Sequence, residues 1–199
     1  MLRLQVGSLF WSGLPCSLHV WVSRGTSGKT RSNPRGNPDK HDCTKEANMI
    51  AARFALCILI CLARGVWWIC EQPVSSVAMY LHYIEHAIYP ARTMLGFQAG
   101  FIQKFWMGLF GHRSLKRTVI FGDAPFIHMF SLAARVTQAD REKHQWSSDG
   151  NMKVTVNKST GKKSVSGGPK LKDTQSYPIR FCSRIAEYFK KYCVESQPY

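Results

Sequence analysis

The chain has 199 residues, with 27 Lys and Arg against 12 Asp and Glu, and therefore a net charge of +15. Hydrophobic residues make up 45% of the sequence and aromatic residues 12%, a composition that excludes wholesale disorder and supplies the core of about one domain. The positive charge, most of which lies after residue 100, favours a polyanionic partner such as nucleic acid or an anionic membrane surface.

The seven cysteines are odd in number and form no C-x-x-C pair, so the sequence indicates neither a zinc ribbon nor a thioredoxin-like site. Several lie inside apolar runs, where a free cysteine behaves as a small hydrophobic residue. We therefore predict a reduced, intracellular protein, without distinguishing nucleus from cytoplasm. Polar residues interrupt the apolar N-terminal segment and argue against a signal peptide.

The first half of the chain predicts strand, loop, helix and strand in turn. Residues 4–12 form a short strand, and the Gly-, Ser- and Pro-rich residues 24–42 form a long loop. A helix is expected from Thr44 to Gly65. Its apolar tract at residues 54–63 is shorter than the roughly 20 residues of a membrane span, so a buried helix is favoured and membrane association is a weaker alternative.

The next strand, residues 66–70 (VWWIC), is continuously apolar, which is typical of a strand covered on both faces of a parallel sheet. The later predictions are helices at 75–89, 124–136 and 180–193, an apolar stretch at 97–110, a strand at 118–122, and a hairpin around 153–156 and 163–165. Strands that alternate with helices predict an α/β fold. We expect an α/β domain over residues 1–136, a basic polar loop and hairpin over 137–176, and a closing helix over 177–199.

Three motifs follow predicted strands or lie beside them. Gly13-Leu14-Pro15-Cys16-Ser17 follows the first strand, Glu71-Gln72-Pro73 follows VWWIC, and a basic segment at residues 110–122 contains Arg113, Lys116 and Arg117. Catalytic and ligand-binding groups of open α/β sheets lie at the carboxyl ends of strands. The Cys16 thiol and the Glu71 carboxylate are therefore expected to face one crevice.

In this order the motifs resemble those of the cytosine-5 DNA methyltransferase family, where a G-P-P-C-Q/S loop, an E-N-V or E-N-P loop and a later Y-G-x-P-Q-x-R-x-R-V segment occur in succession. The E-Q-P triplet after a Trp-rich strand is similar to divergent algal and viral relatives with E-Q-P-S-S or E-N-P-S-S. The closing TQSYPIRFCSRIAEYF segment lies where the family places a final loop and helix that close the crevice.

The resemblance implies that DNA is the partner and that S-adenosylmethionine is the methyl donor. A cytosine flipped out of the duplex would be attacked at carbon six by the Cys16 thiolate, while Glu71 bonds N3 and the exocyclic amine. Arg113, Lys116 and Arg117 would hold phosphates or position the base. Cations lower a thiol pKa, and the candidates that lie near Cys16 in the sequence are Arg24, Lys29 and Arg31.

The family's cofactor-binding half precedes the Cys loop, whereas only 15 residues precede Cys16 here, without an F-x-G-x-G motif. We therefore expect a partial doubly wound, Rossmann-like sheet that lacks the N-terminal cofactor-binding strands. The corresponding function is that of a truncated, split or degenerate methyltransferase-like protein, inactive alone, for which a second chain would supply the cofactor-binding half.

Other interpretations of the same residues stay open. The main alternative is a non-catalytic basic module that binds nucleic acid, helped by the Lys-rich residues 158–172. In that case Cys16 is only a small residue at the end of a strand. Glu71 is a carboxylate favoured at a helix N-terminus by the helix dipole, and residues 113–117 are a basic surface exposed to solvent. A weaker alternative is a zinc hydrolase based on His82-Tyr83-Ile84-Glu85-His86, an H-x-x-E-H pattern whose third ligand would come from Asp123, Asp140 or Glu142. No metal ligand is assigned on this basis, because an ordinary packed helix shows the same pattern.

Overall fold

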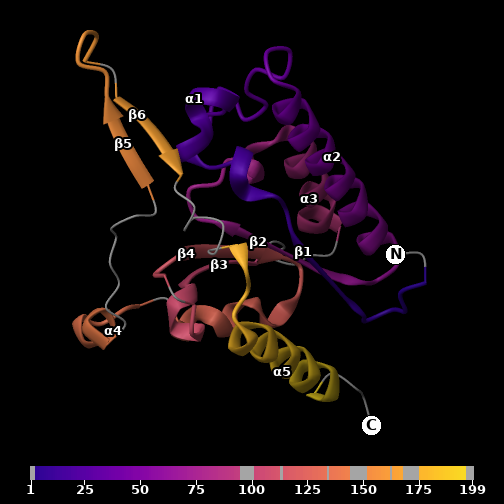
Figure 1. Ribbon diagram of the computed structural model, residues 1–199. Coiled ribbons are helices and arrows are strands. Elements are labelled where there is room, and N and C mark those ends of the chain that lie inside the picture. Colours follow the sequence, from indigo (N-terminus) through magenta and orange to yellow (C-terminus); the bar gives the residue numbers. More distant parts are fainter. Residues whose placement is uncertain are drawn as a thin grey trace.

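The computed structural model describes residues 3–94, 101–112, 114–133, 135–143, 152–161, 163–167 and 175–195. The protein is an α/β fold with a four-stranded mixed sheet and a separate two-stranded hairpin (Figure 1). The strand order of the main sheet is β1-β2-β4-β3. The strands are β1 (Leu9–Gly13), β2 (Trp67–Pro73), β3 (Phe101–Trp106) and β4 (Arg117–Gly122), and the hairpin is β5 (Met152–Val156) and β6 (Lys163–Gly167).

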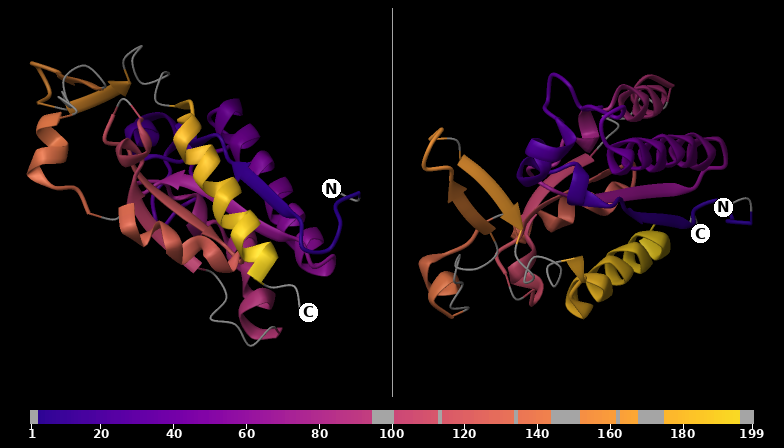
Figure 2. Two further views of the ribbon diagram at one scale, coloured as in Figure 1. Left: turned by 90° about the horizontal axis from the view of Figure 1, so that it is seen from below. Right: turned by 45° about the horizontal axis from the view of Figure 1, so that its top comes forward.

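Helices lie on both faces of the main sheet (Figure 2). One face is covered by α2 and α3, and the other by α5 together with a 3₁₀ segment, Pro125–Ala133. The α-helices are α1 (Arg24–Ser27), α2 (Asp42–Ala63), α3 (His82–Met94), α4 (Gln138–Lys143) and α5 (Ile179–Glu195). The remaining 3₁₀ turns are Cys16–Leu18, Trp21–Ser23, Ala78–Tyr80 and Met107–Phe110.

The sheet is mixed, so the prediction of a parallel sheet is correct for one strand pair only. β1 and β2 pair in parallel, whereas β4 is antiparallel to both β2 and β3. The reason is the connection between β3 and β4, residues 107–116. A parallel crossover needs about a dozen residues or more. Because this connection is shorter, β4 runs antiparallel to β3, and it lies between β2 and β3.

Most other predicted elements are present with altered bounds. The first strand begins at Leu9 rather than residue 4, and the long helix begins at Asp42. The segment predicted as a helix over 75–89 divides into the 3₁₀ turn Ala78–Tyr80 and α3, because the extended backbone of Leu81 separates the two. The segment predicted as helical over 124–136 contains the 3₁₀ helix Pro125–Ala133. The hairpin and the closing helix are confirmed.

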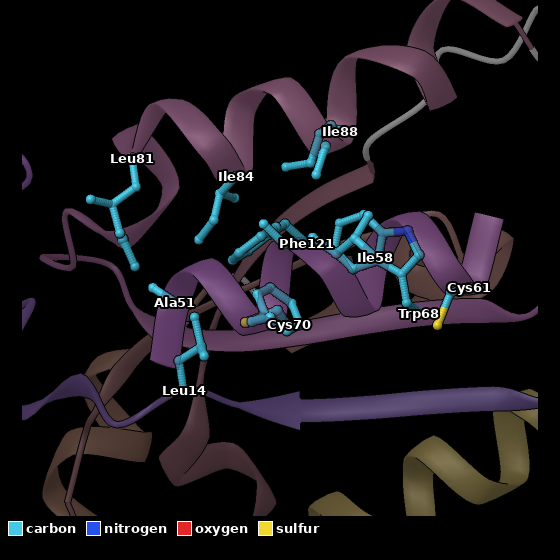
Figure 3. Packing of buried hydrophobic residues seen from close by; sticks show 14 of the residues in the cluster. Leu14, Ala51, Ile58, Cys61, Trp68, Cys70, Leu81, Ile84, Ile88 and Phe121 are labelled. Atoms are coloured by element: carbon cyan, nitrogen blue, oxygen red, sulfur yellow. The ribbon is translucent and has the colours of Figure 1, made fainter. Parts of the chain in front are cut away.

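Two apolar cores lie on opposite faces of the sheet, and neighbouring residues of β2 contribute to each. Trp68 packs edge-on against Phe54 and Phe121 on the α2 and α3 side, with ring centroids 6.1 and 6.0 Å away (Figure 3). Trp67 packs on the other face against α5. Because side chains alternate along a strand, the continuous apolar run of β2 serves both cores, as predicted for a strand buried on both faces.

Helix α2 extends well beyond the apolar tract at residues 54–63. It has 22 residues, and its most apolar window has a mean hydropathy of 1.8, so by length and composition it meets the requirement for crossing a membrane. Its inner side, including Ala51, Phe54 and Ile58, is buried in the protein's own core, whereas Leu56 and Leu59 are exposed on the outer side.

Candidate active site

Two neighbouring parallel strands bring the Cys16 loop and Glu71 to the same edge of the sheet. Gly13, the last residue of β1, is in register with Glu71 of β2, and Cys16 begins a 3₁₀ turn three residues later. The Gln72 side chain donates a hydrogen bond of 2.8 Å from Nε2 to the Leu14 carbonyl oxygen. In turn, Ser76 Oγ donates a hydrogen bond of 2.8 Å to Gln72 Oε1. This buried network holds the loop that precedes Cys16 against β2.

Glu71 is a buried carboxylate, 3% exposed, with two different neighbours. Lys116 Nζ lies 3.2 Å from Oε1, and the Tyr177 hydroxyl donates a hydrogen bond of 2.7 Å to Oε2. The contact with Lys116 is an ion pair without hydrogen-bond geometry, and among the described residues Oε1 has no hydrogen-bond partner. Oε1 is therefore occupied by the Lys116 ammonium group and shielded from solvent, and a ligand donor would reach it only by replacing Lys116.

Cys16 is half-buried and close enough to Lys116 and Glu71 for both to act on its thiol. Burial raises the pKa of the Cys16 thiol above its ordinary value, Lys116 opposes this rise and Glu71 adds to it. The net direction is upward, so the sulfur is held as a thiol at neutral pH. A nucleophilic cysteine needs the opposite shift, and the site therefore holds the sulfur in its less reactive form.

The cation that acts on Cys16 is Lys116, and the expectation that Arg24, Lys29 or Arg31 plays this part is not met. Lys29 is fully buried elsewhere, with Nζ 3.3 Å from His19 Nδ1 and hydrogen-bonded to Asn48 Oδ1. The Arg31 guanidinium lies 5.4 Å above the Tyr80 ring. Nearness in the sequence was a poor guide, because α1 and the loop after it carry these residues away from Cys16.

Tyr177 completes the site from the far end of the chain. It precedes α5, and its ring packs edge-on against Trp11 at 6.0 Å and lies tilted against Phe181 at 5.8 Å. A Cβ at Gly13 would lie 2.3 Å from the Tyr177 hydroxyl oxygen, so the lack of a side chain at Gly13 makes room for the phenol. Burial, and then the Glu71 charge, raise the pKa of Tyr177, which keeps the hydroxyl a donor. Sequence reasoning identified the closing segment but not this residue; a Tyr-Pro pair at the start of that segment was the available signal.

The three predicted phosphate-binding residues have different surroundings. Lys116 is largely buried and faces Glu71 rather than solvent. Arg117 is exposed, and its guanidinium lies 5.5 Å from the centre of the Trp106 ring. Arg113 lies outside the described residues. The structure therefore brings Lys116 together with Cys16 and Glu71, and leaves Arg117 on the surface.

The H-x-x-E-H residues lie on α3, where the rings of His82 and His86 are 6.5 Å apart. Within the described ranges, no three His, Cys, Asp or Glu side chains form a group that fits a metal ion. All seven cysteines are free thiols.

The site thus groups a half-buried thiol with a buried carboxylate that is paired with an ammonium group and a phenol. Comparison with known proteins adds no family to this description: no protein-family model, curated protein or solved structure matches the chain.

Proposed function

We propose that this chain is the base-binding, nucleophile-bearing part of a cytosine-5 DNA methyltransferase-like protein, with a partial doubly wound sheet, and that it does not transfer methyl groups by itself. The observation that carries the proposal is the buried Glu71 carboxylate, held by Lys116 and Tyr177 beside the Cys16 thiol. The exocyclic amine of cytosine is a donor suited to a carboxylate oxygen, where it would take the place of Lys116, and the thiol lies on the same edge of the sheet.

The chemistry available to these residues is reversible addition to the pyrimidine ring. After the thiol loses its proton to solvent, the sulfur of Cys16 forms a bond to carbon six and the electron pair of the C5–C6 double bond moves onto carbon five. Carbon five then takes a proton from water. Loss of the original carbon-five proton and cleavage of the S–C6 bond restore the base and the thiolate. Glu71 would orient the base through its amine, and Lys116 would partly offset the carboxylate charge.

The residues present do not fit S-adenosylmethionine. The space above Gly13, at the end of β1, is filled by the Tyr177 hydroxyl, and the described residues before β1 form turns. The proposal assigns that site to a second polypeptide that supplies the cofactor-binding half.

DNA is the proposed partner because cations are exposed on the surface beside the site. Arg117, the residue after Lys116, and Arg180, three residues after Tyr177, are exposed there, whereas Arg184 on α5 is ion-paired with Glu187. Such cations attract phosphate without reading base sequence.

The second candidate function is a non-catalytic module that binds nucleic acid. The raised pKa of the Cys16 thiol favours it, because a protonated sulfur is a poor nucleophile. The two functions differ in whether the chain activates carbon five of cytosine.

The test is exchange of the carbon-five hydrogen of cytosine with solvent, which needs no methyl donor. Single-stranded DNA with tritium at carbon five avoids the cost of unstacking a base from a duplex. We expect release of tritium that increases with pH between about 7 and 10 as the thiolate forms. Cys16→Ser should abolish the release and Glu71→Gln should slow it about 100-fold, whereas Cys182→Ser, a change at an exposed cysteine of α5, should leave it unchanged.

Two results would overturn the proposal in different ways. DNA binding without any tritium release across this pH range would identify the non-catalytic module. Absence of both DNA binding and release would exclude both functions.

A further inference from the structure

Two basic side chains face each other inside the protein, between the loop that joins α1 to α2 and the turn that begins at Cys16. His19 is 1% exposed and Lys29 is fully buried. Lys29 Nζ lies 3.3 Å from His19 Nδ1 and also donates a hydrogen bond to Asn48 Oδ1 of α2. The His19 ring bonds the Ala47 backbone as well, so its Nδ1 is the acceptor for the Lys29 ammonium group. The pair therefore carries one positive charge at neutral pH.

No carboxylate of the described residues balances this pair. Lys29 is the charged group that acts on the His19 ring, and burial is what acts on Lys29. The other groups that face the pair are neutral: the Asn48 amide, the carbonyl groups of Ala47 and Arg35, and the Tyr83 hydroxyl. The Arg35 guanidinium acts on Tyr83 and adds a further positive charge. A second proton on the His19 ring would thus place two buried cations side by side, which is strongly unfavourable.

Lys29 also holds the α1–α2 loop, residues 28–41, against α2. Its side chain runs past Gly36, where a Cβ would lie 2.7 Å from Lys29 Cγ. Asn48, which accepts from Lys29, donates a hydrogen bond of 2.8 Å from Nδ2 to the Arg35 carbonyl oxygen. The loop is therefore attached to α2 through Asn48 at two points, and one of them is the Lys29 ammonium group.

His19 connects the same pair to the candidate active site. Its backbone N–H donates a hydrogen bond of 2.9 Å to the Cys16 carbonyl oxygen and closes the 3₁₀ turn that begins at Cys16. Its own carbonyl oxygen accepts a hydrogen bond of 2.7 Å from the Val77 N–H. A displacement of His19 would therefore reach Cys16 through one backbone hydrogen bond.

We propose that Lys29 and His19 form an acid-sensitive latch: when His19 takes a proton from solvent, the two cations separate, the α1–α2 loop leaves α2 and the Cys16 turn loosens. Burial, and then the Lys29 charge, lower the pKa of His19 from 6.5 to about 4 in the closed state. The ring regains its ordinary pKa once the loop is open, so opening takes up a proton as the pH falls below about 6.5.

Lys29 does not set the pH range of this latch. Burial lowers its pKa only to about 8, so the ammonium group keeps its proton in both states between pH 5 and 7. The inference does not depend on the proposed methyltransferase-like function, because it concerns the loop and the turn and not the reaction at Cys16.

Hydrogen exchange of the α1–α2 loop, corrected for the intrinsic effect of pH on amide exchange, tests the latch. The Asn37 amide, 2.9 Å from the Ser27 carbonyl oxygen, is a suitable probe. Its protection should fall about 20-fold between pH 7 and 5, the factor that follows from the two pKa values of His19. Peptides from β2 and β4 should keep their protection, which separates a local opening from unfolding of the whole protein.

His19→Gln is the decisive variant, because the Gln oxygen can accept from Lys29 and the amide does not titrate. It should abolish the pH response of the loop. His128→Gln is the matched control, since His128 is exposed on the 3₁₀ helix Pro125–Ala133, on the other face of the sheet. It should keep the full response.

The rate of methylthiolation at Cys16, relative to that at the exposed Cys182, follows the Cys16 turn in the same proteins. This ratio should rise as the pH falls from 7 to 5, except in His19→Gln. Equal loop protection at pH 7 and 5 in the original protein would overturn the latch, as would a response that persists in His19→Gln. A loop response with a constant ratio would overturn the link to Cys16. If His19→Gln does not fold, the original protein still decides through the comparison of the loop with β2 and β4.

Discussion

Two neighbours of Cys16 act on its thiol in opposite directions. Lys116 lowers the pKa of the thiol and Glu71 raises it. Because the thiolate is the species that reacts with iodoacetamide, Glu71→Gln should lower the pKa and speed alkylation at neutral pH. Lys116→Gln should raise the pKa and slow it. The measurement is the pH dependence of carboxamidomethylation at Cys16, followed by mass spectrometry of its peptide.

Cys182 serves as the internal control for this comparison, because it is exposed on α5 and should react at the same rate in all three proteins. An identical Cys16 rate profile in both variants would show that neither side chain influences the thiol.

At the level of single residues, the sequence located the Cys16 thiol and the Glu71 carboxylate but not the residues that contact them. Cys16 was found because it follows an apolar strand and a Gly-Leu-Pro turn, and Glu71 because it directly follows the apolar run VWWIC; both signals are local. Tyr177 lies 106 residues from Glu71 along the chain, and no local pattern links the two. Lys116 was found as a cation, but its pairing with Glu71 depends on the direction of β4, which places residue 116 just before the strand that pairs with β2.

Phe181 is the fully buried aromatic side chain of helix α5 at the sheet. Its ring lies 5.6 Å from Trp11, 5.5 Å from Phe105 and 5.8 Å from Phe130. Phe181→Ala should lower the free energy of unfolding by about 3 kcal/mol or more, from lost burial and the cavity that remains. Ile179→Ala, at an 84% exposed position of the same helix, should change it by less than about 0.5 kcal/mol.

Urea denaturation of the two variants checks this difference. Similar losses in both would mean that the helix does not depend on the Phe181 contacts.

At the level of elements, periodicity and composition identified the helices and strands better than their directions. The continuous apolar run of β2 correctly predicted a strand buried on both faces. The same run could not reveal that β4 is antiparallel to it, because direction depends on the length of the β3–β4 connection and on the insertion of β4 between β2 and β3. The sequence likewise could not predict that Pro125–Ala133 is a 3₁₀ helix, because its apolar residues are equally compatible with an α-helix.

The stability of the whole molecule should depend on pH through two buried groups with opposite effects. Burial lowers the pKa of His19 to about 4 from 6.5, so stability is lost as the pH falls through that interval. Burial raises the pKa of Asp123 to about 6 from 3.8, so its contribution is present at low pH and is lost as the pH rises through that interval. Between about pH 4 and 6 the two contributions therefore partly cancel.

Asp123→Asn removes the titrating carboxyl group and keeps an oxygen that can accept the hydrogen bond from the Trp68 backbone N–H. Urea unfolding at a series of pH values should show stability rising more steeply between pH 4 and 6 in the variant than in the original protein. Parallel curves would contradict the protonation assigned to Asp123.

The hydrogen bond between Tyr177 and Glu71 joins distant parts of the chain and should form late in folding. β3 and β4 are close in sequence and can pair early, whereas β1 must wait for β2 across the intervening α2. Tyr177 reaches Glu71 across 106 residues, after every strand of the main sheet has been made. Because ribosomes synthesise the N-terminal part of a chain first, the sheet edge with Cys16 and Glu71 can form before Tyr177 has been synthesised. Newly made protein should thus pass through a stage in which this polar edge is open to solvent, and the docking of α5 ends that stage.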